Sequence, residues 1–211
     1  MDKNRETKLY SIAFALGIFT IFYNLVEGII ATWFGFEDET LALFGFGLDS
    51  FIEMISGMGI IYMITRIRKY PESLRSDFEK TALKVTGTSF YLLTVGLTVS
   101  AIINVVQGHT PETTFWGVVI SIISILVMLG LMYGKLKVGR ELNSAPILAD
   151  AGCTKICIYM SVILLISSGI YELTGFAYAD AIGTLGLAWF SYSEGKECFE
   201  KVKNNDLCCD H

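Results

Sequence analysis

Charged residues are scarce in this sequence: they make up 18% of its 211 residues, against about 25% in ordinary soluble domains. Hydrophobic residues make up 53%, and the mean hydropathy is +0.53. These values lie outside the range of soluble globular proteins and indicate an integral membrane protein.

Several sequence motifs are also missing. The sequence has no readable Ser/His/Asp arrangement, zinc-protease helix or phosphate-binding loop, so we expect neither an enzyme nor a resident cofactor. No nucleic-acid partner is expected. The first apolar run is too long for a cleavable signal peptide and lacks a small-residue cleavage site.

Disulfide-forming cysteines are not expected either. Cys153 and Cys157 lie within an apolar run, and Cys198, Cys208 and Cys209 lie near the C-terminus. None lies in a predicted outer loop, which argues against a disulfide framework and favours metal or thiol chemistry.

Six stretches are long and apolar enough to cross a bilayer, which takes about 20 residues for a hydrocarbon layer about 30 Å thick. They cover about 9–34, 40–65, 83–107, 114–134, 147–171 and 177–195. We therefore predict an all-α integral membrane protein with one domain of six transmembrane helices (1–195). A short cytoplasmic tail with Cys and His residues (196–211) follows it.

Positive charge is confined to alternate connections. Lys and Arg occupy the N-terminal arm, the connections at 66–84 and 135–140 and the C-terminal tail, with Lys155 as the one exception inside a span. The other three connections hold acidic residues and no Lys or Arg. By the positive-inside rule both termini are cytoplasmic. The cytoplasmic membrane of a prokaryote is the expected location.

The second span carries two acidic residues, Asp49 and Glu53. A carboxylate at the centre of a membrane helix costs about 2.5–3.5 kcal/mol on insertion scales, so it marks a functional site by default. Residues four apart share a helix face. Gly45 and Ser56 lie on that face too, which makes a small, polar stripe that predicts contact with the bundle interior.

The fifth span carries a second polar face. Asp150, Cys153 and Cys157 fall within about 60° of one another on a helical wheel, and Lys155 lies roughly opposite. Two carboxylates and two thiols are the four ligands that a tetrahedral metal site needs, so we predict Asp49, Glu53, Cys153 and Cys157 as ligands. Thiols favour zinc, cadmium-like or other thiophilic ions.

Three segments resemble the cation diffusion facilitator family of divalent-metal transporters. "GFGLDSFIE" resembles its D-x-x-x-D helix, with Asp49 and Glu53 at the ligand positions. "LADAGCTKIC" resembles its A-D-x-x-H-x-x-x-D helix, with Cys153 and Cys157 in place of the His and the second Asp. "YADAIGTLGLAW" resembles the acidic motif of its sixth helix through Asp180.

The resemblance implies export of a divalent metal from the cytoplasm, driven by proton antiport through alternating access, and a homodimer. The two cysteines depart from the family pattern and put its usual metal preference in doubt. Only some 16 residues follow the sixth span (196–211), so the family's soluble C-terminal domain is not expected, and a dimer would form through the transmembrane helices.

Other polar residues have secondary predicted roles. Asn24, Glu27, Asp150 and Asp180 are candidates for a second shell or a proton and ion path. Cys208, Cys209 and His211 are candidates for metal capture on the cytoplasmic side. For Lys155 two readings stay open: pairing with a buried carboxylate, or extension toward the headgroups.

The predicted function is therefore secondary transport of divalent transition metals, with zinc as the first expectation. One alternative is a membrane metal sensor or accessory subunit that transports nothing. A less favoured alternative is an intramembrane thiol oxidoreductase, against which the C-x-x-x-C spacing and the lack of outer cysteines argue.

Overall fold

The computed structural model describes residues 3–37, 41–70, 75–107, 115–174 and 179–205. These residues form helices and no strand. The helices are α1 (Lys3–Glu37), α2 (Leu41–Lys69), α3 (Arg75–Gln107), α4 (Phe115–Leu142), α5 (Ala145–Thr174) and α6 (Ala179–Asn204). The predicted all-α class and the count of six helices are confirmed.

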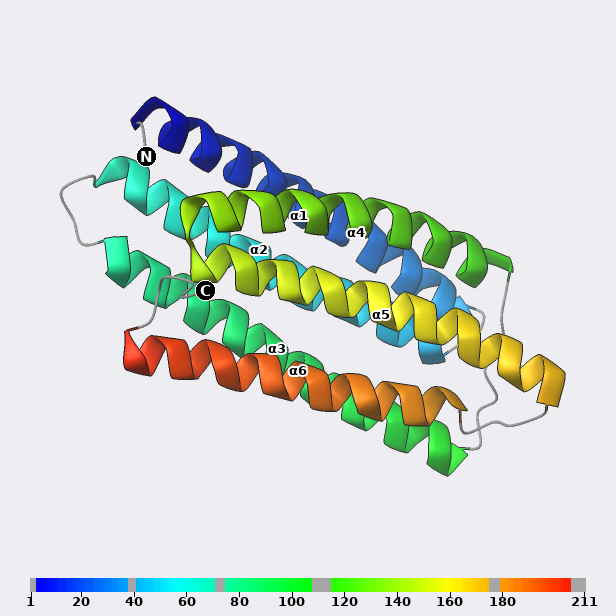
Figure 1. The fold of residues 1–211 in the computed structure, drawn as a ribbon. Coiled ribbons are helices and arrows are strands. Elements are labelled where there is room, and N and C mark those ends of the chain that lie inside the picture. The colour runs from blue at the N-terminus through cyan, green and yellow to red at the C-terminus, as the bar shows by residue number, and fades with distance from the viewer. Residues whose placement is uncertain (1–2, 38–40, 71–74, 108–114, 175–178, 206–211) are drawn as a thin grey trace.

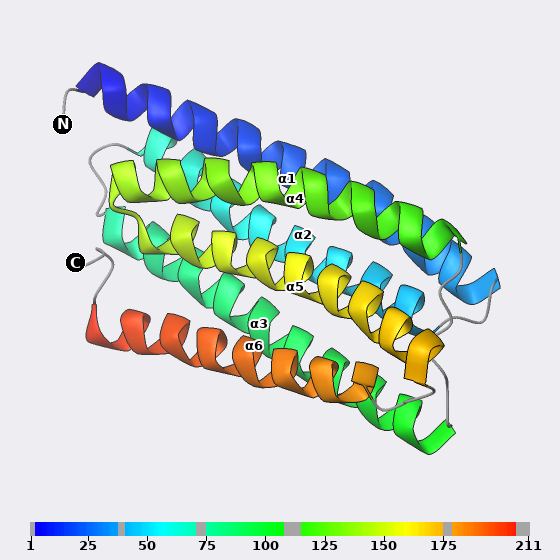
Figure 2. The ribbon, with the colours of Figure 1, turned by 45° about the vertical axis from the view of Figure 1, so that its right-hand side comes forward.

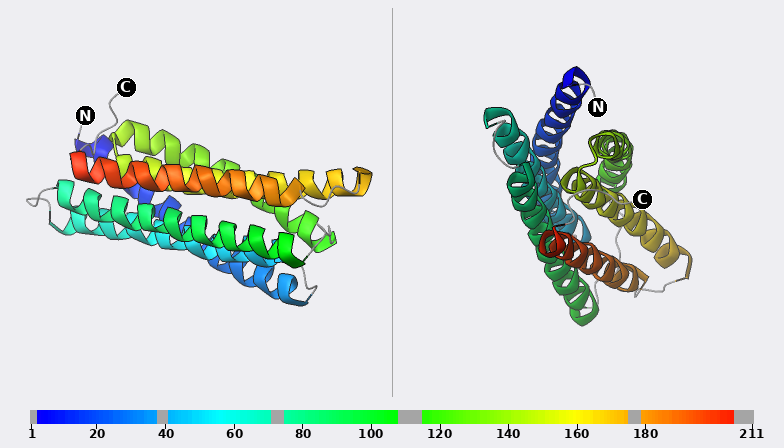
Figure 3. Two further views of the ribbon diagram at one scale, coloured as in Figure 1. Left: turned by 90° about the horizontal axis from the view of Figure 1, so that it is seen from below. Right: turned by 60° about the vertical axis from the view of Figure 1, so that its left-hand side comes forward.

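The six helices lie lengthwise beside one another in a single bundle (Figures 1 and 2). The most extensive packing joins α1 to α2, α3 to α6, α2 to α3 and α4 to α5. Seen from below, α6 runs beside α3 (Figure 3). The start of α1 and the end of α6 lie at the same end of the bundle (Figure 1).

Within the described residues, five helices, α1 to α5, are long and apolar enough to cross a membrane. α6 runs with them but is not among these five, so the sixth predicted span stays a prediction. α6 also continues to Asn204, beyond the predicted end of the span at 195. The first part of the predicted tail is therefore helical, and Cys198 is buried there against Gly87 of α3.

A tight turn joins α4 to α5. Asn143 has a φ of 48°, the left-handed conformation that often ends a helix. The Ser144 N–H donates to the Gly139 carbonyl (3.0 Å), and the Asn143 N–H donates to the Arg140 carbonyl (3.1 Å). These two bonds define a Schellman motif. Because the turn is so short, the last turns of α4 lie directly against the first turns of α5.

Glycine allows α1 and α2 to approach closely. A Cβ added at Gly47 would lie 2.7 Å from the Thr32 backbone nitrogen and 3.0 Å from the Gly28 carbonyl oxygen. Small residues at such contacts let helix backbones pack together in membranes. Gly47 therefore permits the close approach of α1 and α2, whereas nothing lies within 4 Å of a Cβ at Gly186 of α6.

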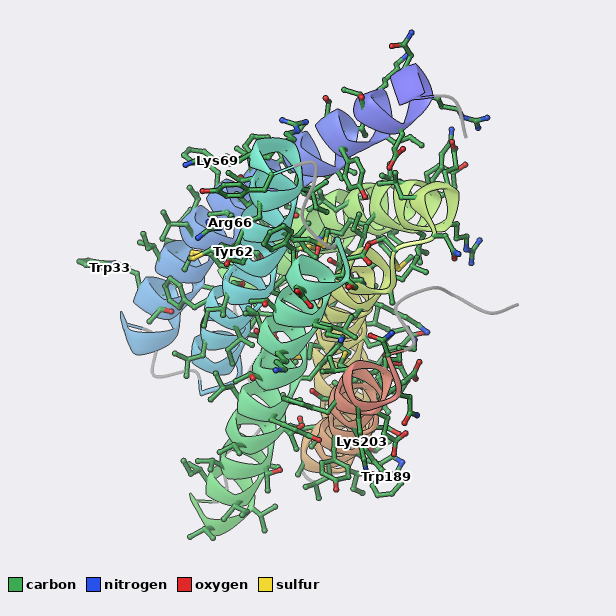
Figure 4. All side chains as sticks on the ribbon, turned by 90° about the vertical axis from the view of Figure 1, so that its left-hand side faces the viewer. Trp33, Tyr62, Arg66, Lys69, Trp189 and Lys203 are labelled. Atoms are coloured by element: carbon green, nitrogen blue, oxygen red, sulfur yellow. The ribbon has the colours of Figure 1, made fainter. Side chains whose placement is uncertain are left out.

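Basic side chains gather where the termini lie. Arg66, Arg68 and Lys69 end α2, and Lys201 and Lys203 end α6. Figure 4 shows Tyr62, Arg66 and Lys69 along α2, with the Arg66 guanidinium 5.2 Å from the centre of the Tyr62 ring. The positive-inside rule predicts that this end faces the cytoplasm.

The outer surface of the bundle is apolar. Trp33 and Trp189 project away from the bundle in Figure 4 and are 69% and 72% exposed. Many aliphatic side chains on the same surface are exposed as well. Such a surface suits contact with lipid rather than with water.

Candidate metal site between α2, α4 and α5

The predicted acidic pair meets a thiol in the middle of the bundle. Asp49 and Glu53 of α2 and Cys157 of α5 are each at most 2% exposed. The Cys157 Sγ lies 2.8 Å from Asp49 Oδ2 and 2.9 Å from Glu53 Oε2. The structure therefore brings together three of the four predicted ligands.

The carboxylate oxygens of Asp49 and Glu53 that do not face Cys157 have different surroundings. Glu53 Oε1 accepts a short hydrogen bond from the Thr154 hydroxyl of α5. Asp49 Oδ1 is buried and has no hydrogen-bond partner among the described residues. A buried acceptor without a partner is costly, and a bound cation would relieve that cost.

Cys153, the fourth predicted ligand, makes different contacts: its thiol lies beside the Ser56 hydroxyl, with Asp150 and Glu53 as its charged neighbours. It is buried in an apolar cluster with residues of α3, α5 and α6, among them Phe90, Leu187 and Cys198. Its role as a ligand stays a prediction, because the described contacts of the acidic pair involve Cys157 and Thr154 instead.

Asp150 forms a second polar group next to the acidic pair. Its Oδ1 accepts a hydrogen bond of 2.6 Å from the Ser56 hydroxyl, and Ser56 also lies 3.1 Å from the Thr86 hydroxyl of α3. Its Oδ2 lies 2.9 Å from the ammonium of Lys135. The predicted polar face of α2 at Ser56 thus meets the predicted polar face of α5.

The prediction that Lys135 lies in a cytoplasmic connection (135–140) is wrong. Lys135 lies within α4 and is 2% exposed, because α4 continues to Leu142. Besides Asp150, its Nζ lies 3.5 Å from Glu53 Oε1 and donates a hydrogen bond of 2.8 Å to Thr154 Oγ1. A sequence signal was present, because Lys135 stands in a buried stripe at helical spacing: Met128, Leu131, Lys135, Val138 and Leu142.

Lys155 does not take that role. Its Nζ lies 5.6 Å from the centre of the Tyr159 ring and 5.3 Å from that of the Phe190 ring, so aromatic faces hold its charge. The partly buried carboxylate of Glu194 on α6 is also a charged neighbour of Lys155, so of the two readings left open, proximity to a carboxylate is supported, at Glu194 rather than at the acidic pair. The counter-ion of the buried carboxylates comes from α4.

Asn24 and Glu27 lie on α1, which packs against α2. Glu27 accepts hydrogen bonds of 3.0 Å from the Tyr23 hydroxyl at Oε1 and from the Ser50 hydroxyl at Oε2. Asn24 is fully buried, and its Nδ2 donates to the Thr20 carbonyl at 3.0 Å. Ser50 directly follows Asp49 in α2. Glu27 of α1 is therefore a buried neighbour of the acidic pair, with its partner Ser50 one residue away from Asp49 along α2.

The remaining predicted residues are less informative. Asp180 lies in the first turn of α6, but its side chain lies outside the described residues. Cys208, Cys209 and His211 also lie outside the described residues. Their predicted roles stay predictions.

A preformed metal cage is absent from the described part of the chain: no three His, Cys, Asp or Glu side chains are spaced to hold an ion as they stand. The three side chains that meet are instead in direct contact. For tetrahedral zinc, with Zn–S about 2.3 Å and Zn–O about 2.0 Å, sulfur and oxygen ligands lie about 3.5 Å apart. To admit an ion, the two sulfur–oxygen separations would therefore have to grow by roughly 0.6–0.7 Å, which small changes of side-chain torsion angles supply.

These features define a helical membrane protein with carboxylates, a thiol and an ammonium gathered in its core. The family described as the cation efflux transmembrane domain matches residues 13–201. The match covers most of the chain, so the chain belongs to this family of cation transporters, and the resemblance noted in the sequence is confirmed. No curated protein matches the chain significantly.

Proposed function

We propose that the protein exports divalent transition-metal ions, zinc foremost, from the cytoplasm in exchange for protons. Asp49, Glu53 and Cys157 hold the ion midway through the bundle. The observation that carries this proposal is the position of one thiol within 3 Å of two buried carboxylates from another helix. Thiolate and carboxylate together suit zinc and cadmium better than magnesium or calcium.

The formal charges of the site support a divalent cargo. Asp49, Glu53 and Asp150 bring three negative charges, and Lys135 brings one positive charge. With the Cys157 thiol still protonated, the excess of two negative charges in a buried setting is costly, and an ion of charge two balances it. Loss of the thiol proton when the ion binds adds one further negative charge. Protons that occupy the same carboxyl and thiol groups compete with the metal, which couples metal movement to proton movement.

Movement of the ion needs a site that opens alternately to the two sides. The site lies between α2 and α5, helices that pack against each other less extensively than α1 packs against α2. Sliding or rocking of the α4–α5 hairpin relative to α2 would separate Cys157 from the carboxylates and release the ion.

Flux through purified protein in liposomes tests the proposal. We expect uptake of Zn²⁺ and Cd²⁺ that rises with an opposing pH gradient, and much less uptake of Mg²⁺. Asp49→Ala should abolish this flux, while Asp77→Ala, which removes an exposed acid at the start of α3, should leave it unchanged. A folded protein that binds Cd²⁺ but moves none would instead be a sensor.

A further inference from the structure

The two oxygens of the Glu53 carboxylate face different groups. Oε2 is in contact with Cys157, where the transported ion is proposed to bind. Oε1 lies 3.5 Å from the Lys135 ammonium and accepts a hydrogen bond from Thr154. One carboxylate is therefore shared between the cargo site and a fixed cation of the protein.

Lys135 is held in place by groups from two helices. Its Nζ contacts Asp150 at 2.9 Å and Thr154 at 2.8 Å, both on α5, and Glu53 on α2. A buried lysine must be paired to offset its desolvation. Here the pairing also ties α4 and α5 to the helix that carries the acidic pair.

We propose that Lys135 is a built-in competitor of the transported ion. In the metal-free site its ammonium is shared between Glu53 and Asp150, and when a divalent ion binds at Glu53 the ammonium is left to Asp150 alone. The lysine thereby lowers the affinity of the site and speeds release of the ion. This inference rests on the proposed metal site and adds a residue that tunes its affinity.

The reason for the competition is electrostatic. A divalent ion on Glu53 would lie within a few ångströms of the ammonium, in an interior where water screens charge poorly. Repulsion between the two cations raises the free energy of the metal-bound site. Asp150 limits this effect because it offers the ammonium a second partner away from the ion.

Removal of Lys135 and removal of the Asp150 charge should change Cd²⁺ affinity in opposite directions. Lys135→Met keeps an unbranched side chain but removes the charge, so Cd²⁺ should bind tighter, by roughly the 10–100-fold typical of residues that support metal ligands. Asp150→Asn leaves the ammonium on Glu53 alone, so Cd²⁺ should bind more weakly by a similar factor. A merely structural role would weaken binding in both variants.

The measurement is titration of the purified full-length protein with Cd²⁺ at one fixed pH, followed by the ultraviolet charge-transfer band of cadmium–thiolate bonds. In liposomes, Lys135→Met should lower both the KM and the maximal rate of Cd²⁺ flux, because a tighter site releases its ion slowly. Lys137→Met, which removes an exposed lysine two residues away on α4, is the matched control and should change neither.

A double variant tests the same inference if Lys135→Met fails to fold because it leaves Asp150 without its cation. In Lys135→Met/Asp150→Asn no ammonium is left unpaired, and Cd²⁺ should bind at least tenfold tighter than in Asp150→Asn alone. Unchanged or weaker binding on removal of the lysine, in either background, overturns the inference. Absence of flux in a wild-type protein that binds Cd²⁺ would refute transport but leave the role of Lys135 in affinity standing.

Discussion

Serine replacements at Cys157 and Cys153 distinguish the roles of the two cysteines that the sequence predicts as ligands. Cys157 touches both carboxylates, at 2.8 and 2.9 Å, whereas Cys153 packs in an apolar cluster. If the ion binds where the thiol and carboxylates meet, Cys157→Ser removes a soft ligand and Cys153→Ser does not. We therefore expect Cys157→Ser to lower metal affinity and Cys153→Ser to lower stability.

Loss of residues that merely support metal ligands costs about 10–100-fold in affinity, so loss of the thiol ligand itself should cost at least about 100-fold for Cd²⁺. This corresponds to about 2.7 kcal/mol of binding free energy. Mn²⁺ prefers oxygen ligands, and its affinity should fall less than tenfold because serine keeps an oxygen at the site.

Cys153→Ser should act mainly on stability. It buries a hydroxyl at the edge of an apolar cluster, where Ser56 is the neighbouring polar group, so the free energy of unfolding should fall by at most about 1–3 kcal/mol. Cd²⁺ affinity should stay within a few-fold of the wild type, because Cys153 does not touch the acidic pair directly.

The assay is Cd²⁺ and Mn²⁺ titration of both variants beside the wild type, with thermal unfolding in the same detergent. Equal losses for Cd²⁺ and Mn²⁺ in Cys157→Ser would refute thiol ligation. A loss of Cd²⁺ affinity in Cys153→Ser as large as that in Cys157→Ser would show that both thiols reach the ion, as the sequence pattern predicts.

Two further predictions address packing and the ion path. Gly47→Ala places a Cβ 2.7 Å from the Thr32 nitrogen, so it should force α1 and α2 apart and lower the free energy of unfolding by about 1–3 kcal/mol. Gly96→Ala is the control, because nothing lies within 4 Å of its Cβ, and it should be neutral or slightly stabilising. Thermal unfolding in detergent measures both. Equal effects of the two changes would contradict the close approach. Glu27→Gln should slow Zn²⁺ flux while leaving Cd²⁺ affinity unchanged, because Glu27 contacts Ser50 beside the site and not the ion; unaltered flux would remove it from the path.

The sequence predicted the outline of this protein because hydropathy and helical periodicity are local properties. Six helices, the burial of the acidic pair on α2 and the polar face of α5 all follow from spacing along the chain. The segments "GFGLDSFIE" and "LADAGCTKIC" were enough to identify the family.

The partners of each polar group were decided by tertiary structure. Asp150, Cys153 and Cys157 share a face on a helical wheel, yet their partners differ. Asp150 meets Lys135, Cys153 lies between Ser56 and an apolar cluster, and Cys157 meets the acidic pair. An arc of about 60° on one helix is wide enough to touch different neighbours. The rotation and crossing of the helices, which no single segment encodes, select among them.

Lys135 illustrates the same limit. In the sequence it stands at the end of an apolar run, beside basic residues that do face outward, such as Lys137 and Arg140. α4 continues past the expected end of the span to the Asn143 cap, and this places Lys135 inward and Lys137 outward, because residues two apart lie on opposite sides of a helix. The sequence alone fixes that a buried acidic site needs a balancing cation, but only the packing of α4 against α5 and α2 shows which residue supplies it.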